Sequence, residues 1–167
     1  MKNLIVILGV PGVGKTATCD VLKNILPKNL LIDGDEVWKP TPFIYDQEAK
    51  DLFYKNIVYL LNNYFGYSKI DNIIFPYIVP REEVLQEQIL DMLNLKNVRL
   101  HIFALTCTEQ EHANRINNDT NPRRKNTSLG SSIEKLKNYK TIKDEIIDTT
   151  TLTPSQVAEQ IKKTIGK

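Results

Sequence analysis

The sequence predicts an α/β fold with a mainly parallel sheet that helices cover on both faces. Five short apolar runs, partly β-branched, recur along the chain, and helix-like segments separate them. This alternation is typical of repeated βαβ units, whose parallel strands are buried on both sides. A glycine-rich stretch directly follows the first run and marks the first strand-to-helix connection. The expected strands are residues 3–8, 30–33, 72–75, 98–105 and 145–149.

The helices expected between these strands are defined mainly by their ends. The first helix runs from about Lys15 to Leu26, because Pro27 disfavours the helical conformation of the residue before it. Further helices are predicted at 47–65, 81–94 and 109–118. A helix therefore lies between each pair of consecutive strands, as a parallel sheet requires.

Two capping patterns predict further helix starts. Ser131 is followed three residues later by Glu134, which is the spacing of a capping box. In the last helix Thr153 can cap, Pro154 suits the first helical position, and Gln156 can reach back to the cap. Its apolar face is Val157, Ile161 and Ile165.

Length and composition are those of an ordinary globular domain. The 167 residues are 41% hydrophobic and 25% charged, so we expect a single domain over residues 1–167 that folds by itself. The 22 basic and 20 acidic residues are too evenly balanced for a protein that binds nucleic acid through its overall charge. A nucleic-acid partner is therefore not expected, and the chain should be a monomer or a homodimer.

The cysteines and the apolar segments bear on location. Cys19 and Cys107 have no metal-binding or redox spacing, and no secretory leader pattern is recognisable. No apolar stretch approaches the 18 or more residues of a membrane span. These observations predict a cytoplasmic protein that does not enter a membrane.

The glycine-rich stretch carries the most specific motif of the chain. Gly9, Gly14, Lys15 and Thr16 match G-x-x-x-x-G-K-[ST], the phosphate-binding P-loop. Several backbone N–H groups must converge on a polyphosphate, so side chains are absent where the loop wraps closely. Lys15 then adds a positive charge for the β and γ phosphates, and the Thr16 hydroxyl suits Mg²⁺. The residues expected to contact the nucleotide here are Gly9, Gly12, Val13, Gly14, Lys15, Thr16 and Ala17.

With this motif between a strand and a helix, the chain resembles the small P-loop kinases over nearly its whole length. These include shikimate, gluconate, adenylylsulfate and nucleoside monophosphate kinases and chloramphenicol phosphotransferase. The resemblance implies a P-loop NTPase three-layer sandwich with a five-stranded parallel sheet in the order 2-3-1-4-5, helices on both faces and a short lid. It also implies ATP and Mg²⁺ as cofactors. The alternative is a glycine-rich turn that binds nothing.

Two carboxylates follow the second predicted strand in the stretch Ile-Asp-Gly-Asp. Ligands of α/β sheets bind at the carboxyl ends of strands, so Asp33 and Asp35 should face the same crevice as the P-loop. The resemblance implies that Asp35 positions the acceptor hydroxyl or takes its proton, and that Asp33 helps to organise Mg²⁺. The same three residues are also good turn formers, which is the structural alternative.

A basic segment follows the fourth strand and its helix. It resembles the lid of small kinases and is expected at about residues 119–130. The resemblance implies that Arg123 or Arg124 reaches the transferring phosphate, and that Arg115 lies near adenine or the phosphates. Arginine suits phosphate oxygens because its planar guanidinium donates paired hydrogen bonds. A solvated, basic loop is the alternative.

Two further stretches bear on the nucleotide and the metal. The segment 148–151 resembles the part of these kinases that lies beside adenine, which implies that it supplies mainly backbone contacts. The third strand ends in Phe75, Pro76 and Tyr77 and lacks the aspartate that many P-loop NTPases place there. Metal binding is therefore expected to depend on Thr16 and Asp33. ATP is expected because the guanine signature of GTPases is absent.

Aromatic residues gather in sequence around the expected acceptor side. They are Trp38, Phe43, Tyr45, Phe75 and Tyr77. They could form a wall for a planar substrate, or simply pack in the core. Arg81 is close enough to the third strand to reach an anionic substrate. His101 and His112 have no recognisable partners.

The function predicted from the sequence is an ATP- and Mg²⁺-dependent phosphotransferase. Its acceptor is a small molecule that carries a hydroxyl or a phosphate. Two alternatives remain open: a nucleotide-binding resistance or regulatory protein without kinase turnover, and a polynucleotide end kinase. The proposed catalytic residues are Lys15, Asp35, Arg123 and Arg124.

Overall fold

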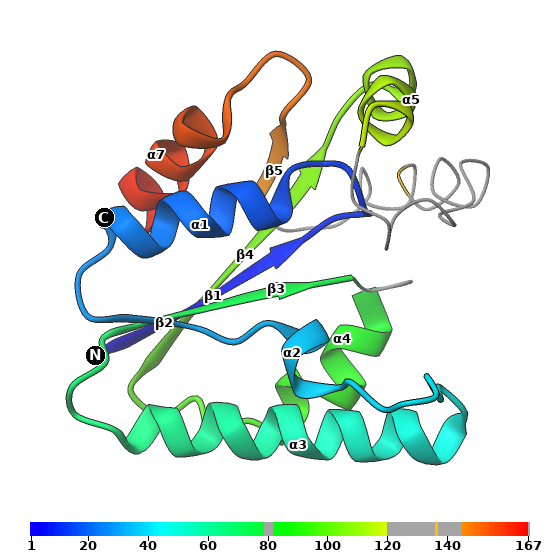
Figure 1. Cartoon of the computed structure of the whole chain (residues 1–167). Helices are drawn as coiled ribbons and strands as arrows, with labels where there is room; N and C mark the ends of the chain where they lie inside the picture. The colour runs from blue at the N-terminus through cyan, green and yellow to red at the C-terminus, as the bar shows by residue number, and fades with distance from the viewer. Residues whose placement is uncertain (79–81, 120–135, 137–144, 167) are drawn as a thin grey trace.

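A five-stranded parallel sheet forms the centre of the molecule (Figure 1). The computed structural model describes residues 1–78, 82–119, 136 and 145–166. Within them the strand order is β2-β3-β1-β4-β5, and every paired neighbour is parallel, as predicted. The strands are β1 (Lys2–Leu8), β2 (Asn29–Leu31), β3 (Asn72–Tyr77), β4 (Val98–Thr106) and β5 (Glu145–Asp148).

The central position of β1 explains its continuous apolar run. It pairs with β3 on one side and with β4 on the other. Helices cover both faces, so the side chains from Leu4 to Leu8 are all fully buried. A half-exposed strand would instead alternate apolar and polar residues.

Helices lie in two layers around the sheet. Figure 1 shows α1 (Lys15–Ile25) and α7 (Pro154–Ile165) on one face, and α3 (Gln47–Gly66) with α4 (Glu82–Gln88) on the other. The remaining helical elements are α2 (Gly34–Val37), the 3-10 turn η1 (Leu90–Met92) and α5 (Glu109–Asn117). None of the described helices is both long enough and apolar enough to span a membrane.

Two helix ends agree with their predicted signals. The structure confirms the capping box of α7, in which Thr153 and Gln156 bond to each other's backbone N–H and Pro154 opens the helix. It also confirms the end of α1, where Leu26 is extended before Pro27. Both ends are set by neighbouring residues, which is why local sequence identifies them.

Two helical segments differ from the prediction. The helix expected over 81–94 is divided, because the backbone of Ile89 leaves the helical region between α4 and η1. The residues after Asp33 form the short helix α2, and the Asp33 side chain caps it by accepting from the Asp35 N–H. The predicted lid at about 119–130, apart from Asp119, lies outside the described residues, as do Arg81, Arg123, Arg124 and the Ser131–Glu134 capping box.

Candidate functional site

The P-loop connects the carboxyl end of β1 to the first turn of α1. Its glycines at positions 9, 12 and 14 have φ values of 154°, 89° and 102°, which lie in the region that favours glycine. A Cβ on Gly9 would lie 2.6 Å from Val13 Cγ2 and 2.9 Å from the Leu105 carbonyl oxygen. A Cβ on Gly14 would meet nothing within 4 Å, so this glycine borders open space. The loop is therefore tightly packed behind Gly9 and open at Gly14.

The first turn of α1 supplies the positive side of the site. Lys15 Nζ donates to the carbonyl oxygens of Gly9 at 2.6 Å and Val10 at 3.1 Å, which holds its charge against the loop. Thr16 and Ala17 are exposed in the same turn. The first turn contains no acidic residue, so the partial positive charge of the helix N-terminus is not neutralised locally.

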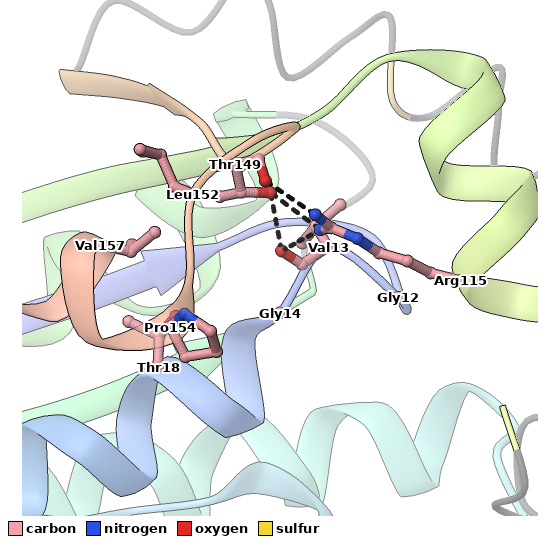
Figure 2. Close-up of a pocket in the computed structure, with 9 residues that line it drawn as sticks. All are labelled: Gly12, Val13, Gly14, Thr18, Arg115, Thr149, Leu152, Pro154 and Val157. Carbon is pink, nitrogen blue, oxygen red and sulfur yellow. Dashed lines mark hydrogen bonds between the residues drawn. The ribbon is translucent and has the colours of Figure 1, made fainter. Parts of the chain in front are cut away.

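A pair of polar residues holds the far side of the loop (Figure 2). Thr149 is buried after β5, and its hydroxyl lies 3.0 Å from the Val13 carbonyl oxygen. Arg115 at the end of α5 donates to the Thr149 carbonyl at 2.7 Å and to its hydroxyl oxygen at 3.1 Å. The carboxylate of Glu111 accepts from Arg115 Nε at 2.7 Å. The guanidinium is thus fixed in one orientation beside the loop.

A buried histidine binds the same loop two residues earlier. His112 Nε2 lies 2.9 Å from the Pro11 carbonyl oxygen, and the side chain is fully buried. Because a carbonyl only accepts, Nε2 must carry the hydrogen. Nδ1 has no hydrogen-bond partner within the described residues. His112, which has no partner recognisable from the sequence, thus has one in the structure.

These contacts orient the P-loop N–H groups. In a trans peptide the C=O and N–H point in opposite directions. Holding the carbonyl of Pro11 toward His112, and that of Val13 toward Thr149, therefore directs the N–H groups of Gly12 and Gly14 away from α5. Successive N–H groups arranged in this way form an anion-binding concavity.

A pocket of about 260 Å³ opens beside this arrangement. Figure 2 shows that the P-loop, α5 and the segment after β5 all contribute to it. Leu152, Pro154 and Val157 form an apolar wall, and Arg115 contributes its planar guanidinium. A flat heterocycle fits such surroundings, because apolar groups and a cation both favour contact with a ring face. The remaining lining residues are Gly12, Val13, Gly14, Thr18 and Thr149.

The two predicted carboxylates differ in their surroundings. Asp33 is half-buried, and its Oδ1 accepts from the Asp35 N–H at 3.0 Å, whereas the Asp35 side chain is exposed. Burial raises the pKa of the Cys19 thiol to about 12; the charge of Lys15 opposes this shift, and that of Asp33 adds to it. The charges of Lys15 and Asp33 both act on the Cys19 thiol. Because Cys19 belongs to α1, the Asp33 carboxylate lies near the first turns of that helix.

The comparisons with known proteins agree with this geometry. The family model described as an AAA domain matches residues 5–137. The chain belongs to this AAA-domain family. No curated protein matches the AAA-domain chain in sequence.

Solved structures show the same fold over the full length of the AAA-domain chain. The tunicamycin resistance protein of Deinococcus radiodurans has 22% identity and a TM-score of 0.73, with 99% of this chain and 96% of that chain covered. A sugar kinase from a Janibacter species has 13% identity and a TM-score of 0.72, covering 99% and 95%. Shikimate kinase from Acinetobacter baumannii, in complex with shikimate, has 18% identity and a TM-score of 0.64, covering 99% and 93%. The fold is that of the small P-loop kinases.

The residues of the AAA-domain chain fit a nucleoside triphosphate. The loop is open at Gly14, the adjacent lysine and helix N-terminus are positive, and the pocket beside Arg115 has an apolar wall. For Mg²⁺, the Thr16 hydroxyl and the Asp33 carboxylate are oxygen donors of the kind that this ion prefers. In the described part of the chain, no three His, Cys, Asp or Glu side chains form a metal-binding group.

The side-chain roles of two site residues, Thr149 and His112, were not predicted from the sequence. Thr149 was expected to contribute backbone contacts, yet its side chain binds the P-loop carbonyl of Val13. His112 was passed over because its acceptor is a backbone carbonyl, which no residue pattern reveals. For His112 the signal in the sequence is its spacing on α5: His112, Arg115 and Ile116 share one helical face, and Ile116 and His112 both lie against Gly12.

Proposed function

We propose that this AAA-domain chain is an ATP- and Mg²⁺-dependent kinase that transfers the γ-phosphoryl group to a small acceptor with a hydroxyl or phosphate group. The observation that carries the proposal is the common placement of the P-loop and the Asp33–Asp35 turn. Both lie at the carboxyl ends of parallel strands, β1 and β2, which β3 separates, and Asp33 is close enough to α1 to influence the Cys19 thiol. Phosphoryl transfer requires this combination of phosphate binding and an aligned nucleophile.

Each residue has a specific role in the proposal. Lys15 and the N–H groups of the P-loop bind the β and γ phosphates, and the fixed guanidinium of Arg115 lies against the base. Thr16 and Asp33 hold Mg²⁺, which neutralises phosphate charge when it is bound. Arg123 and Arg124 are proposed to reach the transferring phosphate from the lid.

Asp35 is assigned to the acceptor. An acceptor hydroxyl oxygen forms a bond to the γ phosphorus while the bond from that phosphorus to the β–γ bridging oxygen breaks, so ADP leaves. The hydroxyl proton passes to the Asp35 carboxylate. An exposed carboxylate on α2 is suited to this step because it is accessible to a second substrate.

A second candidate is a nucleotide-binding resistance protein without turnover. The observation that supports it is the similarity in fold to the tunicamycin resistance protein. Fold similarity alone does not separate the two functions. Both candidates require ATP binding, but only the kinase requires Asp35. A polynucleotide end kinase is disfavoured by the net charge of +2.

The test combines labelled ATP with a panel of nucleosides, nucleotides, sugars, shikimate-like acids and antibiotics. We expect a phosphorylated acceptor with the unmodified protein. Lys15→Met should abolish both ATP binding and transfer. Asp35→Asn should bind ATP almost normally and lose about 10²- to 10⁴-fold in transfer rate, because it cannot accept a proton.

Glu36→Gln is the matched control for Asp35→Asn. It neutralises the neighbouring exposed carboxylate on α2, whose partner is the exposed Lys39. This variant should keep its transfer rate. Undiminished transfer by Asp35→Asn would remove its catalytic role, and ATP binding without transfer to any acceptor would favour the resistance protein.

A further inference from the structure

A continuous series of aromatic rings lies at the carboxyl end of β3. The Tyr77 ring stacks with Phe75 at a centroid distance of 5.4 Å and an interplanar angle of 15°. It also stacks with Phe53 of α3 at 6.3 Å and 18°. Phe53 in turn meets Tyr54 edge-on, with centroids 5.6 Å apart. The series therefore crosses from the sheet to α3.

This aromatic series touches the turn that carries the two aspartates. A Cβ on Gly34 would lie 3.2 Å from Cζ of Phe53, so the ring packs directly against that residue. Gly34 stands between Asp33 and Asp35. Figure 1 shows α2 in the space between the sheet and α3, in agreement with this contact. The aromatic series thus reaches Gly34, the residue next to Asp35, whose carboxylate is assigned to the acceptor.

Phenol hydroxyls accompany the ring faces. The hydroxyl oxygens of Tyr77 and Tyr54 lie 3.2 Å apart. Partial burial raises the pKa of the Tyr45 phenol above its ordinary value, and the neighbouring Tyr54 contributes to the same shift. Ring faces and hydroxyls therefore occur together, which allows both stacking and hydrogen bonding.

The outer end of this surface is an exposed aromatic pair. Phe43 and Tyr45 stack with centroids 6.2 Å apart, and they are 73% and 48% exposed. The segment that carries them is held in place, because Trp38 Nε1 donates to the Ile44 carbonyl at 2.8 Å. Lys50 Nζ lies 5.3 Å from the centre of the Tyr45 ring. Full burial of a phenylalanine side chain stabilises the folded state by about 1.5–3 kcal/mol. Because Phe43 is mostly exposed, the free protein does not gain most of this stabilisation.

We propose that the acceptor is a ring-bearing alcohol, such as a nucleoside or an aryl glycoside, whose flat ring stacks on Phe43 and Tyr45 while its hydroxyl reaches Asp35. The inference rests on the proposed kinase function, because it names the class of that acceptor. A ring covers the exposed faces of the pair, whereas an open-chain polyol has no face to stack. The phenols of Tyr54 and Tyr45 are suited to hydrogen-bond the sugar hydroxyls of such a molecule.

Trp38 offers a direct binding measurement, since it is the only tryptophan of the chain and lies in the same segment. Its emission is followed while thymidine, uridine or phenyl β-D-glucoside is added. D-Ribose and methyl β-D-glucoside are the matched compounds without a flat ring. Thymidine 5′-monophosphate shows whether the acceptor is the free or the phosphorylated form. We expect saturable changes with the ring-bearing compounds at concentrations about tenfold below any response to their counterparts.

Three variants locate the binding. Phe43→Ala should raise the dissociation constant of the ring-bearing compounds about tenfold, and Phe43→Leu should also weaken binding, because leucine retains apolar surface without a ring. Tyr59→Ala is the control: this tyrosine of α3 is 69% exposed and does not belong to the aromatic series. It should leave binding unchanged.

The outcomes separate this inference from the kinase proposal. Ring-bearing compounds that bind through Phe43 but are never phosphorylated would overturn the kinase and retain the binding site. Phosphorylation of a compound without a flat ring, unaffected by Phe43→Ala, would retain the kinase and overturn the inference. Absence of a saturable response to all three ring-bearing compounds overturns it as well.

Discussion

Individual side chains explain how the P-loop holds its shape. His112 and Thr149 each bind one loop carbonyl, and Arg115 fixes Thr149. These residues lie far from the loop in the chain: Pro11 and His112 are 101 positions apart, and Val13 and Thr149 are 136 positions apart. Their contribution to nucleotide binding is indirect, because they orient N–H groups rather than touch phosphate.

The role of His112 can be tested by varying the distance between Cα and the nitrogen that donates to Pro11. In His112→Gln the amide nitrogen is as many bonds from Cα as Nε2 is, so the bond to Pro11 can persist. In His112→Asn the donor nitrogen lies one bond closer to Cα and does not reach Pro11, so the half-buried Pro11 carbonyl loses its partner at a cost of about 1–3 kcal/mol. We expect the dissociation constant of ATP to rise about tenfold or more in the asparagine variant and less in the glutamine variant.

Calorimetric titration with ATP measures both constants. His101→Asn is the control, since that half-buried histidine of β4 contacts Asn3 rather than the loop. Equal affinity of the glutamine and asparagine variants would show that the hydrogen bond to Pro11 does not position the P-loop.

Asp33 combines two roles that substitution can separate. Its side chain caps α2, and asparagine caps a helix about as well as aspartate does. Asp33→Asn should therefore keep the fold while the dependence of ATP binding on Mg²⁺ weakens, because a charged ligand is lost. Asp33→Ala should in addition lose about 0.5–2 kcal/mol of stability.

Magnesium titrations at fixed ATP, paired with thermal melts, distinguish these effects. An unchanged Mg²⁺ dependence in Asp33→Asn would leave Asp33 with its capping role alone.

At the scale of elements, helix starts depend on local pairs of residues. In α7 the Thr153 hydroxyl accepts from the Gln156 N–H at 3.3 Å, and the Gln156 side chain accepts from the Thr153 N–H at 2.8 Å. This start matters for the site, because Leu152, Pro154 and Val157 border the pocket. The capping box thus holds the apolar wall in position.

Thr153→Ala tests this element. Removal of an N-cap hydroxyl costs about 1 kcal/mol, which lowers the melting temperature of a domain of this size by about 2–4 °C. Thermal denaturation followed by circular dichroism measures the change. Ser155→Ala alters an exposed residue in the same turn and should melt like the unmodified protein. A Thr153→Ala variant that melts with this control would contradict the prediction.

For the whole molecule, ligand binding and stability are linked. A ligand that binds only the folded state stabilises it by about 2.7 kcal/mol at one hundred times its dissociation constant. Mg²⁺ with ATP should therefore raise the melting temperature by about 5–10 °C for a domain of this size. Mg²⁺ alone should have little effect, and Lys15→Met should lose the response to ATP. A melting temperature that ATP does not change would count against the P-loop as a nucleotide site.

Local and periodic features of this protein were predictable from its sequence. The P-loop spacing, the buried run of β1 and the caps of α1 and α7 each depend on residues close together in the chain. The strand order was also correct, but only through resemblance to a family. Physical patterning alone predicts a parallel sheet, since buried strands look alike wherever they stand in it.

Tertiary structure decided which polar side chains support the loop and which rings form one surface. His112 and Thr149 bind backbone carbonyls, and a carbonyl is present at every residue, so no pattern of residue types identifies such a pair. The contact of Phe53 with Gly34 depends on how α3 packs under α2. Asp33 illustrates both limits: its position after β2 was evident from sequence, but its cap on α2 and its influence on Cys19 required folded geometry. Long-range contacts arise from packing of whole elements, and that information is spread over the chain rather than held in any one motif.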